Sequence, residues 1–141
     1  MSAPEAPLLL VEDDQALRRI LARHLRGVGI AVVEASSAEE ATGALQQGLR
    51  PALVIHDVNL PGDTGWDLIR SAAMRRAGPP PVVIASAITV SPRRLAEFGV
   101  AGYLPKPFAL ETLLQTVRRL IAPAVEPDRT GHTGEPTYPG E

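Results

Sequence analysis

Short, uninterrupted apolar runs alternate along this chain with longer segments in which apolar residues recur every three to four positions. Runs without polar alternation are typical of strands that are buried on both faces of a parallel sheet. The runs lie at residues 8–11, 30–33, 82–85 and 101–104, and a further run begins at Val54 and ends in the carboxylate of Asp57. A segment of helical period follows each run, and the short connections imply right-handed crossovers. The sequence therefore predicts an α/β fold, a doubly wound parallel sheet of five strands with helices on both faces.

Helix-start signals support the segments that follow the strands. Asp14 precedes the first helical segment and is an expected N-cap. Ser37 with Glu40 three residues later has the spacing of a capping box. Ser91 is a second expected N-cap, and Pro92 then occupies the first helical position, where its missing N–H has no partner to lose.

The apolar faces of two predicted helices give specific expectations. In the first helix, the residues expected to pack on the sheet are Leu17, Ile20, Leu21, His24, Leu25 and Val28. On this face His24 is expected to be a packed imidazole rather than a ligand. The third helix is expected to be one segment that buries Leu68, Ile69, Ala72 and Ala73.

Length, charge and cysteine content limit the classes of function. A chain of 141 residues is long enough for one ordinary domain. The formal net charge of -2 argues against a nucleic-acid-binding surface, for which a basic surplus is expected. Because the chain has no cysteine, disulfides, thiolate metal sites and cysteine nucleophiles are excluded.

The two ends of the chain differ from its middle. Residues 1–7 lack the positive region of a signal peptide, and the apolar run that follows ends at Glu12, too early for a membrane span. We therefore expect a cytoplasmic protein with no membrane contact. Residues 7–121 are expected to form the folded domain. Residues 122–141 are rich in proline, glycine and charge and are expected to form a flexible tail or linker.

Polar residues with related chemistry follow four of the predicted strands. They are Glu12 and Asp13 after the first, Asp57 after the third, Ser86 after the fourth and Lys106 after the fifth. Because parallel strands end at the same edge of a sheet, we expect these side chains to meet there. Asp57, held by the strand behind it, is the expected centre of this site.

The expected cluster suits metal-assisted phosphoryl transfer. Neighbouring carboxylates repel one another by roughly 4 kcal/mol at 4 Å in a medium of dielectric 20, so the cluster favours a divalent cation. Oxygen ligands without histidine or thiolate favour Mg²⁺, with Mn²⁺ as an alternative. Lys106 and Ser86 would add an ammonium and a hydroxyl for the phosphoryl oxygens, and the Asp57 carboxylate a nucleophile.

Four motifs in order resemble the receiver domain of two-component response regulators. They are Leu9–Asp14, His56–Gly62 together with Gly65, Pro81–Ala87 and Gly102–Phe108. The resemblance extends over about Pro7 to Ile121. It implies a flavodoxin-like fold with strand order 2-1-3-4-5. It also implies an aspartate that accepts a phosphoryl group from a sensor histidine kinase or a histidine phosphotransfer protein, and no turnover of other substrates.

The resemblance also implies a role for each matching residue. Asp57 corresponds to the phosphoacceptor, Asp13 to the direct Mg²⁺ ligand and Glu12 to its partner acid. Further roles fall on Asn59 (metal ligand through its backbone carbonyl), Ser86 (switch hydroxyl), Lys106 (phosphate-binding lysine) and Tyr103 (switch aromatic). The peptide between Lys106 and Pro107 corresponds to one that is usually cis in the family. Downstream, the family implies a protein target or a fused output domain, and homodimerisation on phosphorylation.

Two positions depart from the family pattern. The spacing from Ser86 to Lys106 is about two residues shorter than usual, which predicts a short fourth helix on a face that often carries dimerisation or target binding. His56 stands where the family commonly has an aliphatic residue. It could tune Asp57, but a buried histidine bonded to a neighbouring backbone group is the favoured interpretation of this residue.

Two other functions remain open from the residues alone. A small Mg²⁺-dependent phosphohydrolase would use Asp57 as its nucleophile, but it would need substrate-binding walls over the sheet edge. A receiver-like scaffold that works without phosphorylation would not need the complete set of acids, hydroxyl and lysine.

Overall fold

The computed structural model describes residues 6–58 and 65–121 of the chain. The predicted tail, residues 122–141, and Asn59 therefore lie outside the described residues.

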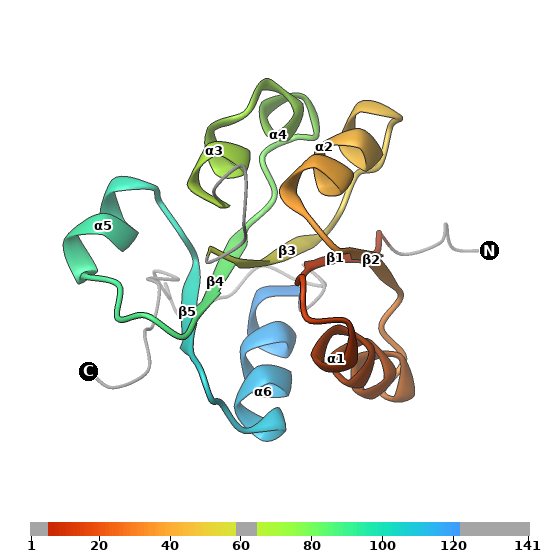
Figure 1. Cartoon of the computed structure of the whole chain (residues 1–141). Coiled ribbons are helices and arrows are strands. Elements are labelled where there is room, and N and C mark those ends of the chain that lie inside the picture. Colours follow the sequence, from red (N-terminus) through yellow and green to blue (C-terminus); the bar gives the residue numbers. More distant parts are fainter. Residues whose placement is uncertain (1–5, 59–64, 122–141) are drawn as a thin grey trace, which may run out of the picture.

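A parallel sheet of five strands forms the centre of the described part, in the order β2-β1-β3-β4-β5 (Figure 1). The strands are β1 (Leu8–Val11), β2 (Val32–Ala35), β3 (Leu53–Asp57), β4 (Val82–Ser86) and β5 (Gly102–Pro105). All four pairings are parallel, and β1, β3 and β4 lie inside the sheet. This confirms the predicted fold class and strand order.

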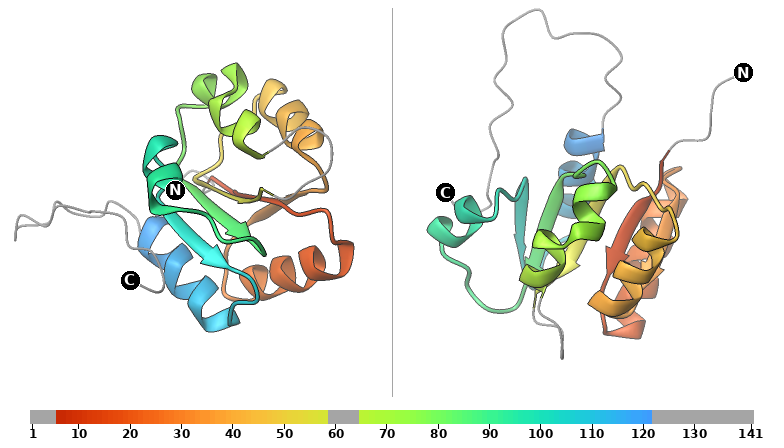
Figure 2. Two further views of the ribbon diagram at one scale, coloured as in Figure 1. Left: turned by 60° about the vertical axis from the view of Figure 1, so that its left-hand side comes forward. Right: turned by 90° about the horizontal axis from the view of Figure 1, so that it is seen from above.

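Helices cover both faces of the sheet, as Figures 1 and 2 show. They are α1 (Gln15–Gly27), α2 (Ala38–Gln46), α3 (Gly65–Arg70), α4 (Ala72–Arg76), α5 (Pro92–Glu97) and α6 (Leu110–Ile121). One apolar layer packs the sheet on α1 and α6. The other packs it on α2, α3 and α4 and includes Leu95 of α5.

Each inner strand contributes to both apolar layers because successive side chains point to opposite faces. In β1, Leu8 and Leu10 belong to the layer under α1 and α6, whereas Leu9 and Val11 belong to the opposite layer. All four side chains are buried. The unbroken apolar runs of the sequence are therefore the consequence of a sheet that is covered on both faces.

The predicted helix starts are present. The Asp14 carboxylate accepts a hydrogen bond from the Leu17 N–H at 3.0 Å. The Ser37 hydroxyl accepts one from the Glu40 N–H at 3.0 Å, and the Ser91 hydroxyl accepts one at the start of α5. The helix α5 corresponds to the predicted fourth helix, because α3 and α4 together occupy the place of the predicted third. It has only six residues, which confirms the expected short helix.

The expectation of a single third helix was wrong. Ser71 has an extended conformation (φ -69°, ψ 156°) between α3 and α4, and its hydroxyl accepts a hydrogen bond from the Met74 N–H at 3.1 Å. A serine at this point offers the backbone an N-cap in place of a continuing helix, so the chain restarts as a new helix.

The expected buried face of α1 was also partly wrong. Ile20, His24 and Val28 are exposed, and the buried residues of the helix are Leu21, Ala22 and Leu25. Ala22 takes part in the contact with the sheet, which turns the buried face away from Ile20 and His24. Ile20 is 53% exposed.

His56 is a polar residue inside the core. Its neighbours in register, Val11 of β1 and Ile84 of β4, both belong to the layer under α2, α3 and α4, so its ring faces that layer. The side chain is completely buried, and its Nδ1 lies 3.0 Å from the Asp57 carbonyl oxygen. Burial lowers the pKa of His56 from 6.5 to about 4.

We expect this buried ring to make folding stability depend on pH. Because the folded pKa lies below the ordinary value of 6.5, the stability contributed by the neutral ring is fully present above pH 6.5 and is lost as the pH falls toward 4. Relative to a His56→Leu variant, the wild-type free energy of unfolding should fall by about 3 kcal/mol between pH 7 and pH 4, at about 1.4 kcal/mol per pKa unit. Urea unfolding of both proteins measures this difference, and identical pH dependence would contradict a buried neutral ring.

Candidate functional site

The candidate site lies at the carboxyl ends of β1, β3 and β5. Asp57 is the last residue of β3, Glu12 directly follows β1 and Lys106 directly follows β5. The two carboxylic acids are buried, with Glu12 3% and Asp57 5% exposed. Residues far apart in sequence meet here because β1 and β3 are neighbours and all strands point the same way.

Lys106 joins the two buried acids. Its Nζ donates a hydrogen bond to Glu12 Oε1 at 2.7 Å and another to Asp57 Oδ2 at 2.9 Å. A single ammonium thus compensates two carboxylates that are removed from water. Removal of the lysine would leave buried negative charge without this compensation, which is costly in a protein interior.

Asp13 adds a third carboxylate at the exposed rim of the site. Glu12, Asp13 and Asp57 each offer one carboxylate oxygen, and these oxygens lie within 4.8 Å of one another. An all-oxygen set of this size fits a hard divalent cation such as Mg²⁺ or Mn²⁺, and Asp13 leaves one side open to water ligands. The structure therefore brings together the acids that the sequence predicts at this edge.

The proximity of these groups changes their protonation equilibria. Burial raises the pKa of Glu12 from 4.5 to about 7, an effect that the nearby Asp57 charge increases and the hydrogen bond from Lys106 opposes. Burial lowers the pKa of Lys106, but its hydrogen bonds to Glu12 and Asp57 outweigh this effect and raise the pKa above 10.5. Lys106 is therefore a permanent cation of the site near neutral pH.

Ser86 and Tyr103 both hold the loop that follows β4. The Ser86 hydroxyl, 1% exposed at the end of β4, donates to the Ile88 carbonyl at 2.8 Å and accepts from the Ile88 N–H at 3.0 Å. The Tyr103 hydroxyl donates to the same carbonyl at 3.3 Å and accepts from the Val90 N–H at 3.3 Å. Two side chains from adjacent strands thus share one loop carbonyl.

Backbone contacts connect this loop to the lysine. The Lys106 N–H donates to the Ser86 carbonyl at 2.8 Å, across the ends of β4 and β5. The peptide between Lys106 and Pro107 is cis, as the resemblance implies.

The sequence did not point to an aromatic and cationic cluster beside the site. Trp66 of α3 packs on Phe98 with ring centroids 4.5 Å apart, and the Arg70 guanidinium lies 4.1 Å from the Phe98 centroid. Arg94 of α5 lies 5.3 Å from the Trp66 centroid. We define these four residues as the Trp66 cluster. The only tryptophan of the chain, nine residues after Asp57, was the one available signal.

A hollow of about 380 Å³ lies between this cluster and the loop that follows β4. Trp66 and Arg94 line one part of it, and Ser86, Ile88 and Val90 line another. The loop held by Ser86 and Tyr103 therefore borders open space on the side of α3 and α5.

The predicted site residues thus fall into three groups. Glu12, Asp13, Asp57 and Lys106 form one cluster. Ser86 and Tyr103 lie beside it and hold the neighbouring loop. Asn59, the predicted carbonyl ligand, lies outside the described residues.

Within the ranges that the structure describes, no helix is both long and apolar enough to cross a bilayer.

Curated relatives match the chain over most of its length. Response regulator MprA of Mycolicibacterium vanbaalenii is 33% identical over 132 residues, which cover 93% of this chain and 57% of the relative. The KDP operon transcriptional regulatory protein KdpE of Escherichia coli is 36% identical over 114 residues, 79% of this chain and 49% of the relative. The chain therefore spans about half the length of these two proteins.

A solved structure and a family model agree with these matches. The chemotaxis protein CheY4 of Vibrio cholerae superposes with a TM-score of 0.74 at 30% identity, covering 83% of this chain and 99% of that one. The model of the response regulator receiver domain matches residues 8–118, nearly all of the sheet and its helices. The chain belongs to the receiver-domain family of two-component response regulators.

Proposed function

We propose that Asp57 accepts a phosphoryl group from a phosphohistidine of a sensor histidine kinase or a histidine phosphotransfer protein. The observation that carries this proposal is the contact of Lys106 Nζ with both Glu12 and Asp57, beside the oxygen cluster completed by Asp13. It combines a nucleophile, a fixed cation and a set of metal ligands at one edge of the sheet. Such a receiver acts in the cytoplasm, where it meets the kinase.

Each residue of the site has its own role in the proposed phosphoryl transfer. An Asp57 carboxylate oxygen attacks phosphorus, the phosphorus–nitrogen bond breaks, and its electron pair returns to the donor imidazole. The Lys106 ammonium moves from the carboxylate pair to a phosphoryl oxygen and neutralises charge there. Asp13, Asp57 and Glu12 would hold Mg²⁺, with Glu12 acting through water, and the bound ion would neutralise further phosphoryl charge. On this proposal the protein catalyses its own phosphorylation and dephosphorylation only.

Ser86 and Tyr103 would transmit the change. A phosphoryl group on Asp57 offers the Ser86 hydroxyl a charged acceptor that is stronger than the Ile88 carbonyl. If the hydroxyl turns to that acceptor, the Ile88 carbonyl loses its bond from Ser86 while the bonds to Tyr103 remain, and the populations of the loop shift. The shift would control a protein target, a second copy of the chain or an output domain.

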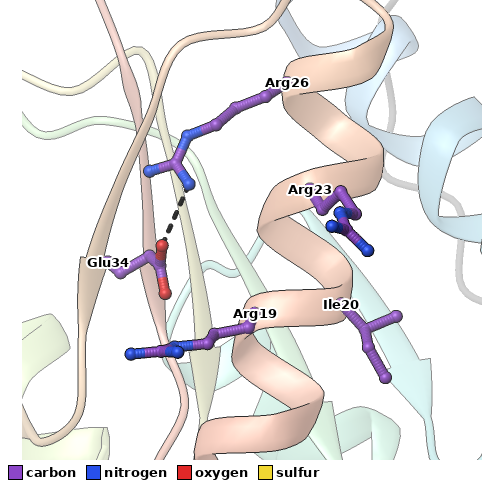
Figure 3. A pocket seen from close by; sticks show the side chains of 5 residues that line it. All are labelled: Arg19, Ile20, Arg23, Arg26 and Glu34. Atoms are coloured by element: carbon purple, nitrogen blue, oxygen red, sulfur yellow. Dashed lines mark hydrogen bonds and ion pairs between the residues drawn. The ribbon is translucent and has the colours of Figure 1, made fainter.

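The outer face of α1 suits the phosphodonor protein. A donor must cover the sheet edge, and α1 starts directly after the acidic cluster. Figure 3 shows Ile20 and Arg23 projecting from the side of α1 away from Glu34, which pairs with Arg26 at 3.0 Å. These residues and Arg19 line a shallow hollow of about 500 Å³. An exposed isoleucine among guanidinium groups fits a partner surface with apolar and acidic side chains.

The division of the chain is part of the same proposal. The family match ends at residue 118 and α6 ends at Ile121, which supports a receiver unit at residues 7–121. Residues 122–141 would serve as a tail or as a linker to an output domain.

We expect Asp57→Asn to abolish acid-labile labelling by a small phosphodonor in Mg²⁺, because the amide cannot act as the nucleophile. Asp67→Asn on α3 should label like the wild type. Labelling is measured with a radioactive phosphodonor, before and after acid treatment. Equal labelling of the Asp57→Asn protein would overturn the assignment, and steady turnover of an unrelated phosphate ester would favour the phosphohydrolase.

Mg²⁺ should stabilise the folded chain because it relieves repulsion among the three carboxylates. At ten times its Kd the ion adds about 1.4 kcal/mol to the free energy of unfolding, which corresponds to a rise in Tm of roughly 5 °C for a domain of this size. Asp13→Asn should remove most of the rise, whereas Glu97→Gln, at the end of α5, should keep it. A Tm that millimolar Mg²⁺ does not change would count against the metal site.

Replacement of Ile20 should weaken docking of the kinase without changing the phosphorylation chemistry at Asp57. Ile20→Glu is expected to slow phosphotransfer from the cognate kinase about tenfold, the effect of losing roughly 1.4 kcal/mol at an interface. Labelling by a small phosphodonor should not change, since Ile20 is remote from the reacting atoms. Val28→Glu, exposed at the other end of α1, is the matched control. Equal slowing by both substitutions, or none, would reject the α1 face as the docking surface.

A further inference from the structure

The imidazole of His56 contacts the phosphoacceptor's own backbone. Its Nδ1 lies 3.0 Å from the carbonyl oxygen of Asp57, and the side chain is fully buried in the layer that contains Val11 and Ile84. The proposed phosphoryl transfer assigns no role to this residue, which directly precedes Asp57 in β3.

The chemistry of the contact fixes the position of the ring proton. A carbonyl oxygen can only accept a hydrogen bond, so Nδ1 must be the donor. The ring is completely buried and Nε2 has no acceptor for a second proton in the described part of the chain, so the neutral form is the one that fits this place. A neutral imidazole with a proton on Nδ1 has none on Nε2, and Nε2 is buried without a hydrogen-bond partner within the described ranges.

The unpaired Nε2 costs folding free energy, because a buried acceptor has lost its water and gained nothing in return. A leucine of similar size would fill the same space without the unpaired nitrogen, but it would also remove the donor to the Asp57 carbonyl. What the imidazole provides and leucine does not is therefore the hydrogen bond from Nδ1 to the carbonyl of Asp57.

That carbonyl belongs to a peptide group held from two sides. The carbonyl oxygen of Asp57 receives the His56 Nδ1–H, and the N–H of the same peptide, on Val58, donates to the Ala85 carbonyl at 3.3 Å. The peptide lies where β3 ends, so its orientation sets the backbone torsion that follows the Asp57 Cα. With β3 fixing the peptide before Asp57 and these two contacts fixing the peptide after it, the Cα that carries the carboxylate is held from both sides, beside Lys106.

We propose that His56 is a positioning residue for phosphoryl transfer, which clamps the peptide after Asp57 together with Ala85 and so holds the carboxylate in its reactive place. The proposal rests on the proposed function of Asp57. It assigns the ring to alignment of the nucleophile, and it predicts that reactivity follows the hydrogen-bond donor rather than the stability of the variant.

Two variants separate the hydrogen bond from the packing. His56→Leu keeps the bulk but has no donor, whereas His56→Asn loses bulk but places an amide N–H near the position of Nδ1. Both are compared with the wild type at pH 7 in thermal unfolding and in Mg²⁺-dependent labelling by a small phosphodonor, with rates corrected for the folded fraction. A long-range ¹⁵N–¹H spectrum of the wild type locates the ring proton independently of activity.

We expect the leucine variant to remain folded at pH 7, yet to label roughly tenfold more slowly than the wild type, the effect of one lost hydrogen bond on an aligned nucleophile. The decrease should fall on the maximal rate, with the half-saturating phosphodonor concentration unchanged. The asparagine variant should melt at a lower temperature and keep a rate within roughly twofold of the wild type. The spectrum should show the proton on Nδ1.

Several results would overturn the inference. A leucine variant with the wild-type rate would show that the donor is dispensable, and an asparagine variant as slow as the leucine variant would show that packing alone matters. A proton on Nε2 would remove the bond itself. If the wild type takes no label on Asp57, the proposed function fails, and this inference fails with it; if only the variants contradict expectation, the proposed function stands.

Discussion

The site depends on the sharing of one ammonium group between two buried carboxylates. Lys106 contacts Glu12, 94 residues away in sequence, and Asp57, 49 residues away. Contact with this cation stabilises both acids in the interior, and the cation is there because β5 ends at the same edge as β1 and β3. The parallel direction of the strands is thus a condition for the chemistry as well as a property of the fold.

Much of this arrangement could be predicted from the sequence because its causes are local or follow from topology. Unbroken apolar runs indicate strands covered on both faces, and the caps at Asp14, Ser37 and Ser91 need only nearby backbone groups. Once the strands are parallel, the residues that follow them must meet, and Glu12, Asp13, Asp57 and Lys106 do so. Neither step requires knowledge of how side chains pack.

The expectations that were wrong depend on packing or on competition between weak alternatives. The buried face of α1 is turned toward Ala22, a small residue whose close contact with the sheet a pattern of large apolar residues does not reveal. At Ser71 a side-chain cap competes with one more helical turn, and the sequence does not say which is lower in free energy. The Trp66 cluster joins α3 to α5 across a gap in sequence that no periodicity spans. The bonds of Ser86 and Tyr103 to one carbonyl likewise arise from the path of the loop.

The Trp66 cluster gives the chain an internal optical probe. Its indole is the only one in 141 residues, stacks against Phe98 and stands 5.3 Å from the Arg94 guanidinium on α5. A positive charge near an indole alters its excited state. A small displacement of α5, which carries Arg94, therefore changes the intensity and wavelength of the Trp66 fluorescence. Movements that begin at the loop after β4 can therefore be followed in time without any attached dye.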